Sequence, residues 1–277
     1  MAGDHALSEL FRYTITDRRP LHSGGCGDLW RAHDRLFDEQ VAVKTIRSDL
    51  SSHALEKAQA SFATEAIVAA RLSRKSPNVV PVRDLGRLDD TLYLVMDWVD
   101  SGDANSADLS HMMGRLSVGA AKKVLLQMCD AVAIAHAEGI VHSDIAPWNV
   151  MYSKASDSYL LADFGLVKVV EANLISLPSR SLLQGGRLAF LPDYARRDIG
   201  RVSYATDVFA LAVTFWSLLD ARALHHEDRT PPVVRVARDQ VDAPFQVRAL
   251  LARFIEGHTR EDSVQQFVDH LYRVPAR

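Results

Sequence analysis

The sequence predicts an α+β fold with two lobes, a small β-rich lobe followed by a larger helical one. Short segments with alternating or β-branched residues fill roughly the first hundred positions, which is typical of strands. From Ser101 onward, apolar residues recur at intervals of three and four, which indicates helices. A loop-forming Asp-Ser-Gly-Asp sequence begins at Asp100, between the two regions. We therefore expect one domain over residues 1–277, divided into an N-lobe (1–99) and a C-lobe (100–277).

The N-lobe is predicted to contain strands around a single long helix. The segment Ser52–Arg74 carries apolar residues at helical spacing. A glycine cluster separates the first two strands and predicts a hairpin. The expected strands are Tyr13–Ser23, Asp28–His33, Gln40–Ile46, Val79–Leu85 and Thr91–Val99.

The C-lobe is predicted to be mainly helical. An amphipathic helix over Val118–Glu138 should end at Gly139, a residue type favoured just after a helix. Two segments too short for helices should pair around a turn, namely Val150–Tyr152 and Tyr159–Leu161. Three further helices are expected, over Ala205–Ala221, Phe245–Glu256 and Ser263–Tyr272.

Composition excludes several classes of protein. The 277 residues are 48% hydrophobic and 24% charged, as in ordinary globular proteins. A net charge of −3 argues against bulk attraction to nucleic acid or anionic lipid. The apolar run Val208–Leu219 is too short to span a bilayer, so we expect no membrane anchor. Cys26 and Cys129 do not form a disulfide framework, which favours a reducing, cytoplasmic location.

Two motifs carry the chemistry. The segment Val141–Asn149 reads Val-His-Ser-Asp-Ile-Ala-Pro-Trp-Asn, and Asp163-Phe164-Gly165 begins fourteen residues after its asparagine. Asp144 can accept a proton, and Asn149 and Asp163 offer hard oxygen ligands that suit Mg²⁺. In order, spacing and identity, these residues resemble the eukaryotic-type protein kinase family, with its His-Arg-Asp-x-x-x-x-Asn and Asp-Phe-Gly motifs.

The resemblance implies ATP and Mg²⁺ as cofactors and a role for each motif residue. Asp144 would orient a hydroxyl and accept its proton, while Asp163 and Asn149 would hold magnesium ions. His142 can be considered as a catalytic group, but the family places a packing residue there, and Phe164 would also pack.

A glycine-rich segment and a lysine strand extend the resemblance. Gly24 and Gly27 match the second and third glycines of the kinase phosphate-binding loop, but His22 replaces the first. An ordinary hairpin turn would explain this cluster equally well. Lys44, in Val-Ala-Val-Lys, and Glu65, on the following helix, would form the pair that grips the α- and β-phosphates. Taken alone, each of the two could be a solvated surface residue.

The same resemblance sketches the adenine pocket. Its expected members lie on both lobes and are plain core or loop residues apart from this context. The roof would be Leu21, Leu29 and Ala42, the gatekeeper Met96, the floor Met151, the hinge backbone Asp97 and Val99, and the ribose contact Asp103.

Several positions depart from the family pattern. Ser143 replaces the arginine that receives an activating phosphate, so regulation through that arginine is not expected. Ala146 replaces the lysine near the γ-phosphate, and Trp148 supplies no compensating arginine. These losses put the rate of transfer in doubt.

Two acidic residues outside the motifs have expected structural roles. Leu191-Pro192-Asp193 resembles the family's Ala-Pro-Glu signature, so Asp193 is expected to pair with Arg260. Asp207 resembles the aspartate that braces the catalytic-loop backbone, although its place near a helix N-terminus would explain it by capping alone.

These residues predict an ATP-dependent protein kinase that modifies serine or threonine hydroxyls of a protein substrate. One alternative keeps the chemistry but changes the acceptor, as in small-molecule kinases of the aminoglycoside and choline type, whose loop also reads His-x-Asp-x-x-x-x-Asn. Another alternative is a nucleotide-binding pseudokinase scaffold, which His22, Ser143 and Ala146 would suit. The sequence gives no oligomeric state.

Overall fold

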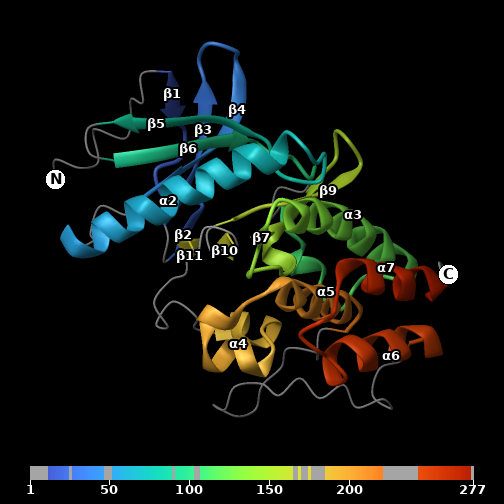
Figure 1. Cartoon of the computed structure of the whole chain (residues 1–277). Helices are drawn as coiled ribbons and strands as arrows, with labels where there is room; N and C mark the ends of the chain where they lie inside the picture. The colour runs from blue at the N-terminus through green and yellow to red at the C-terminus, as the bar shows by residue number, and fades with distance from the viewer. Residues whose placement is uncertain are drawn as a thin grey trace.

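The chain folds into two lobes, an antiparallel sheet with one long helix and a larger bundle of helices (Figure 1). A computed structural model describes residues 12–24, 27–46, 52–88, 91–102, 107–164, 168–169, 174–175, 185–220 and 243–275. The α+β, bilobal architecture expected from the sequence is confirmed.

Six antiparallel strands form the sheet of the small lobe, in the order β1-β3-β4-β6-β5 with β2 also paired to β3. Their bounds are β1 Tyr13–Ile15, β2 His22–Gly24, β3 Gly27–Asp34, β4 Glu39–Thr45, β5 Val82–Leu88 and β6 Thr91–Asp97. The hairpin around the glycine cluster is confirmed, since Gly24 pairs with Gly27.

Two predicted strand boundaries were wrong. The expected strand Tyr13–Ser23 is interrupted between β1 and β2, where Pro20 has no N–H group to donate. The expected strand Val79–Leu85 begins three residues later, at Val82. Val79 instead bridges Leu161 in the other lobe, and the amide of Val80 donates to the Leu161 carbonyl at 3.0 Å.

The long helix α2 (Ser52–Ser73) packs on one face of the sheet, as predicted. Its Phe62 and Ala66 pack with Ile46 and Leu94, which buries the apolar side of the helix. The C-terminal end of α2 is fastened to the large lobe, because Arg71 and, just beyond the helix, Lys75 form ion pairs with the Glu138 carboxylate.

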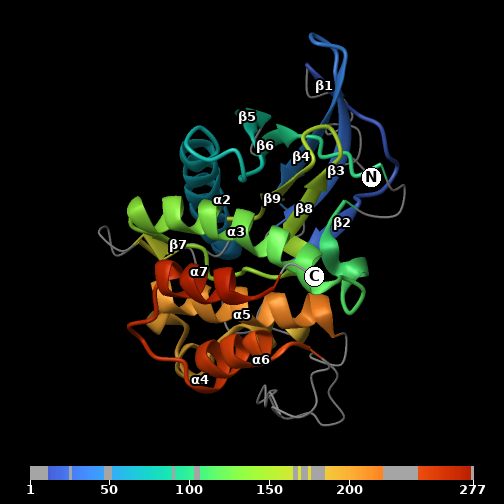
Figure 2. The ribbon, with the colours of Figure 1, turned by 90° about the vertical axis from the view of Figure 1, so that its right-hand side faces the viewer.

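The large lobe is built around α5 (Tyr204–Leu219), which is almost completely buried. In Figure 2, α5 lies below α3 (Val118–Ala137). Helices α6 (Phe245–Leu251) and α7 (Val264–Arg273) also lie below α3 in this view. Ser117 caps α3, and Gly139 follows the helix with a positive φ of 74°, as its role after the helix requires.

The helix expected over Phe245–Glu256 is present but changes geometry. Regular α-helix ends at Leu251, and residues 252–256 form a π-helical turn. Helix α7 begins with a capping box in which Ser263 and Gln266 bond each other's backbone amides.

Short elements surround the interface between the lobes. β8 (Val150–Ser153) and β9 (Ser158–Leu161) form the predicted paired strands. β7 (Ile140–Val141), β10 (Lys168–Val169) and β11 (Leu174–Ile175) form a second small sheet, and α4 (Asp193–Arg197) follows. Within the described ranges, no helix is long and apolar enough to cross a membrane.

Candidate functional site

The sheet register brings together several predicted nucleotide-site residues. Lys44 on β4 lies opposite Leu29 on β3 and opposite Leu94 on β6. Two residues earlier, Ala42 lies opposite Met96. Directly paired residues and residues two apart share one face of a sheet. Leu29, Ala42, Lys44 and Met96 therefore lie on one face, the face that α2 covers through Leu94 and Met96.

The glycine hairpin closes one end of this face. A Cβ atom added at Gly27 would lie 2.2 Å from the Thr45 carbonyl oxygen, so only glycine allows β3 and β4 to approach here. The amide of Leu21 donates to Leu29 at 2.8 Å, while the Leu21 side chain is 46% exposed. The described backbone at Gly24 belongs to β2.

Lys44 sits between two carboxylates from different parts of the chain. Its Nζ lies 2.5 Å from Glu65 Oε1 on α2 and 2.9 Å from Asp163 Oδ1, which follows β9. The side chains of Lys44 and Glu65 are only 12% and 4% exposed. The helix, the sheet and the Asp-Phe-Gly segment therefore meet at one ammonium group.

Burial and charge shift both members of this pair. Burial alone would lower the pKa of Lys44, but Asp163 and Glu65 outweigh it and hold the pKa above its usual range. Burial raises the pKa of Glu65 to about 7, because the nearby Asp163 charge adds to desolvation and Lys44 offsets the two only in part. The ammonium is thus strongly retained, and the carboxylates around it carry negative charge that a further cation would neutralise.

Asp144 and Asn149 form the second half of the site. The Asn149 amide nitrogen donates to the Asp144 carboxylate at 2.9 Å and to the Asp144 carbonyl at 2.7 Å. Both residues are more than nine-tenths buried. The short turn Pro147–Asn149 returns the chain so that these two side chains meet.

Asp207, at the start of α5, braces this loop from below. Its two carboxylate oxygens accept the backbone N–H groups of His142 at 2.9 Å and Ser143 at 2.8 Å. Ser143 has a φ of 67°, a left-handed conformation that costs a non-glycine residue roughly 1 kcal/mol. The prediction for Asp207 is confirmed, and capping alone does not explain its contacts.

The two aromatic motif residues pack as expected. His142 is fully buried, and its ring lies 4.7 Å from that of Phe164. Burial lowers the pKa of His142, so its ring stays neutral in the core. Trp148 packs edge-on against Phe190 at 5.0 Å, filling the position before Asn149 with an apolar contact.

The remaining expected adenine contacts are only partly described. The amide of Asp97 donates to the Pro81 carbonyl at 2.9 Å, so a ligand could meet only the carbonyl of Asp97. Met151 lies on β8, below the sheet, and Val99 follows β6. Asp103 and Gly165 lie outside the described residues.

The donor set fits magnesium in the manner expected of a phosphate-bound ion. Both hydrogen bonds of the Asn149 side chain come from its nitrogen, which leaves Oδ1 as the atom able to coordinate a cation. Asp163, with a φ of 60° and a side chain 34% exposed, supplies a carboxylate nearby, since the preceding residue, Ala162, donates its amide to the Asn149 carbonyl at 2.9 Å. No group of three His, Cys, Asp or Glu side chains in the described ranges could hold a metal by itself. Mg²⁺ needs few protein ligands when phosphates supply the rest.

The predicted Asp193–Arg260 ion pair was wrong. Asp193 is 64% exposed and lies 3.3 Å from Arg196, one turn along α4. The guanidinium of Arg260 lies over the ring of Tyr194, 4.7 Å from its centroid. The shorter aspartate side chain turns to a local partner, and an aromatic contact joins the two segments.

Sequence reasoning missed the residues that support the site from outside the motifs. His136, in the last turn of α3, lies 2.8 Å from Asp207 through Nε2. Tyr194 and His258 meet across two distant segments. The only available signal was a histidine in the last turn of an amphipathic helix, which is too common to single out a residue.

Comparison with known proteins agrees with this arrangement. The chain matches the protein kinase domain family over residues 15–276. It is similar to the serine/threonine-protein kinase PknA of Mycobacterium tuberculosis, with 30% identity over 259 residues, 87% of this chain and 55% of PknA.

Two further relatives are also named serine/threonine-protein kinases. PknE of Mycobacterium tuberculosis is 28% identical over 83% of this chain and 39% of its own length. PknD of Protochlamydia amoebophila is 27% identical over 74% of this chain and 23% of its own length. The chain thus spans between about a quarter and just over half of these relatives.

Proposed function

Because the chain belongs to the protein kinase domain family, we propose that it transfers the γ-phosphate of ATP to serine or threonine hydroxyls of a protein substrate. The family relationship and the described relatives support this activity, since all three relatives are described as serine/threonine-protein kinases.

The observation that carries the proposal is the place of Lys44, whose Nζ lies 2.5 Å from Glu65 Oε1 and 2.9 Å from Asp163 Oδ1. A kinase needs its phosphate-binding lysine, the helix glutamate and the metal-loop aspartate assembled together before transfer. A scaffold without catalytic activity has no need of this alignment. The assembled triad therefore favours an enzyme over a pseudokinase.

Each of the assembled site residues has a separate task in the proposed transfer. Lys44 binds phosphate oxygens as a compact charge, and Glu65 holds its ammonium in place. Asp144 orients the acceptor hydroxyl and takes its proton, while Asn149 fixes the Asp144 carboxylate. Magnesium, when bound, would neutralise charge on the phosphates, with Asp163 and Asn149 as its protein ligands.

The nucleotide would lie across the face of the sheet described above. We assign its binding to Leu21, Gly24, Gly27, Leu29, Ala42, Lys44, Met96, Asp97, Val99, Asp103 and Met151. In this proposal residues 1–99 act as the N-lobe that carries the nucleotide and residues 100–277 as the C-lobe that carries the acceptor site. The buried free thiol of Cys129 supports a reducing, cytoplasmic setting.

Transfer of label from [γ-³²P]ATP in the presence of Mg²⁺ tests the proposal. The wild-type chain should label itself or an added protein such as myelin basic protein. Asp163→Ala and Asp144→Asn should each reduce labelling by at least about 100-fold, because the first removes a magnesium ligand and the second removes the group that takes the proton of the acceptor.

Binding of ATP provides the matched control. Asp144→Asn should keep the thermal stabilisation by ATP and Mg²⁺, since Asp144 acts on the acceptor and not on the nucleotide. Stabilisation by ATP with no turnover in the wild-type chain would contradict the kinase proposal and favour a scaffold. Label found only in small metabolites would instead indicate a small-molecule acceptor.

A further inference from the structure

Helix α4 lacks the ion pair expected to hold it. It directly follows the buried residues Phe190 and Leu191, close to the catalytic loop. Asp193 is 64% exposed, and its one ion pair among the described residues is to Arg196 on the same helix. Ala195 packs locally with Leu191 and Val202, so a longer-range contact must join this five-residue helix, which is too short to be stable by itself, to the rest of the lobe.

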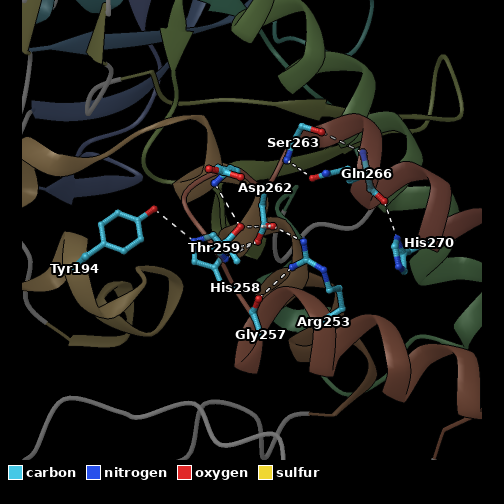
Figure 3. Close-up of polar contacts among 10 residues, drawn as sticks. Tyr194, Arg253, Gly257, His258, Thr259, Asp262, Ser263, Gln266 and His270 are labelled. Carbon is cyan, nitrogen blue, oxygen red and sulfur yellow. Dashed lines mark hydrogen bonds and ion pairs between the residues drawn. The ribbon is translucent and has the colours of Figure 1, made fainter.

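Tyr194 makes that contact (Figure 3). Its ring lies 5.9 Å from the His258 ring, and the two planes differ by 11°. Its hydroxyl lies 3.4 Å from His258 Nε2 and 3.2 Å from Thr206 Oγ1. With Arg260 over the ring, Tyr194 joins α4 to α5 and to the loop before α7.

His258 is a rigid partner because other residues fix it. Its Nδ1 lies 2.9 Å from Asp262 Oδ2, and Phe209 packs edge-on against its ring at 5.3 Å. Asp262 in turn accepts a hydrogen bond from Arg253 at 2.6 Å and one from the backbone N–H of Thr259 at 2.9 Å. Figure 3 shows this chain of contacts running from α4 to the C-terminal helices.

The same contact reaches the catalytic loop by two routes. Phe190, three residues before α4, packs on Trp148, the neighbour of Asn149. Thr206, the partner of the Tyr194 hydroxyl, directly precedes Asp207, which holds the backbone of the loop. A displacement of α4 would therefore shift both supports of the loop that carries Asp144.

We propose that Tyr194 and His258 are positioning residues for the protein acceptor, and that their contact does the work expected of an Asp193–Arg260 ion pair. The inference rests on the proposed kinase function, because it concerns the acceptor side of the same cleft. It assigns α4 an aromatic anchor in place of an ionic one.

Three variants of neighbouring residues test the proposal in the full chain. Tyr194→Ala removes the ring, Tyr194→Phe keeps the ring but removes the hydroxyl, and Asp193→Ala removes the exposed carboxylate. Steady-state kinetics are measured with ATP and myelin basic protein, so that the KM for each can be compared. Hydrogen exchange is followed at the amides of Ala195, Arg196 and Asp198, which bond within α4.

Tyr194→Ala should raise the KM for myelin basic protein about tenfold and leave the KM for ATP unchanged, because Lys44 and Glu65 lie in the other lobe. Exchange at the three amides should accelerate at least about tenfold. In Tyr194→Phe, the KM for myelin basic protein and the exchange rates should stay close to those of the wild type. Asp193→Ala should match the wild type in both.

Either of two kinetic results would overturn the proposal. One is a rise in the KM for myelin basic protein in Asp193→Ala that equals the rise in Tyr194→Ala. The other is a Tyr194→Ala variant in which the KM for ATP rises together with the KM for myelin basic protein. The hydrogen-exchange data show whether Tyr194 anchors α4 even if the wild-type chain transfers no phosphate. In that case the kinase proposal fails, and unchanged exchange in Tyr194→Ala would reject the anchor as well.

Discussion

At the residue scale, the side chains with distinctive chemistry were the ones that the sequence located. A lysine in an apolar strand, an aspartate before Phe-Gly and an asparagine five residues after Asp144 all come together in the structure. Tyr194 and His258 could not be found in this way, because their contact depends on where two distant segments meet. Whether Asp193 pairs with Arg196 or with Arg260 likewise depends on how these two segments pack.

Glu65→Gln tests the buried pair in the cleft. The substitution keeps the shape but removes the charge that holds Lys44, so Lys44 should turn fully to Asp163. We expect kcat/KM for ATP to fall about 10- to 100-fold, which corresponds to losing a charged hydrogen bond worth about 1.5–3 kcal/mol.

Asp157→Asn is the control, since Asp157 is also an ion-paired carboxylate, held by Lys123 at 2.9 Å, but is exposed in the turn between β8 and β9. It should leave the ATP kinetics unchanged. Unaltered kinetics in Glu65→Gln would mean that Lys44 does not need its partner for nucleotide binding.

At the element scale, hydrophobic periodicity located the helices and most strands, and tertiary contacts decided their ends. Strand β5 starts late because the carbonyl of Asn78 and the amide of Val80, on either side of Val79, hydrogen-bond to Leu161 in the large lobe, which no local pattern reveals. Periodicity reports which face is buried, but not which neighbour takes the backbone hydrogen bonds.

Helix α5 carries two buried polar side chains that can be compared by substitution. Asp207 is hydrogen-bonded, whereas the hydroxyl of Thr214 is not bonded to any described residue. In Asp207→Asn, one oxygen that accepts a loop N–H becomes an NH₂ group that cannot accept it. We expect the free energy of unfolding to fall by about 2–3 kcal/mol, measured by urea denaturation.

Thr214→Val on the same helix is the control. Thr214 is fully buried, and its hydroxyl has no hydrogen-bond partner among the described residues. The isosteric change should leave the free energy of unfolding equal or slightly higher, because an unsatisfied buried polar group is removed. Equal losses in both variants would indicate that Asp207 contributes only through its packing.

At the scale of the whole molecule, the network around Asp262 links α4, α5 and the C-terminal helices. Burial alone would raise the pKa of Asp262, but hydrogen bonds from Arg253 and Thr259 hold the pKa below its usual value. The carboxylate therefore stabilises the fold fully above its ordinary pKa. This contribution is lost as the pH falls through the lower native pKa.

Asp262→Asn should reveal this dependence. At about pH 7 the variant should lose about 2 kcal/mol of unfolding free energy, since charged hydrogen bonds are broken. The difference from wild type should begin to shrink as the pH falls below about 4, the ordinary pKa of an aspartate, and should be lost once the pH has passed the lower pKa of the native carboxylate. Denaturation curves at both pH values measure it.

Asp269→Asn, an exposed carboxylate on α7 that accepts from Gln265, should show almost no loss at either pH. A difference between Asp262→Asn and wild type that stays constant across the range would rule out a contribution from ionisation.

The ion pairs of Arg71 and Lys75 with Glu138 make the C-terminal end of α2 a pivot, with Glu65 on a lever arm. Six residues of helix separate Glu65 from Arg71, an arm of about 9 Å at 1.5 Å per residue. A tilt of about 10° would then carry the Glu65 backbone about 1.6 Å, far enough to break its 2.5 Å contact with Lys44. A small swing of one helix thus suffices to disconnect the phosphate-binding lysine, without any change in the large lobe.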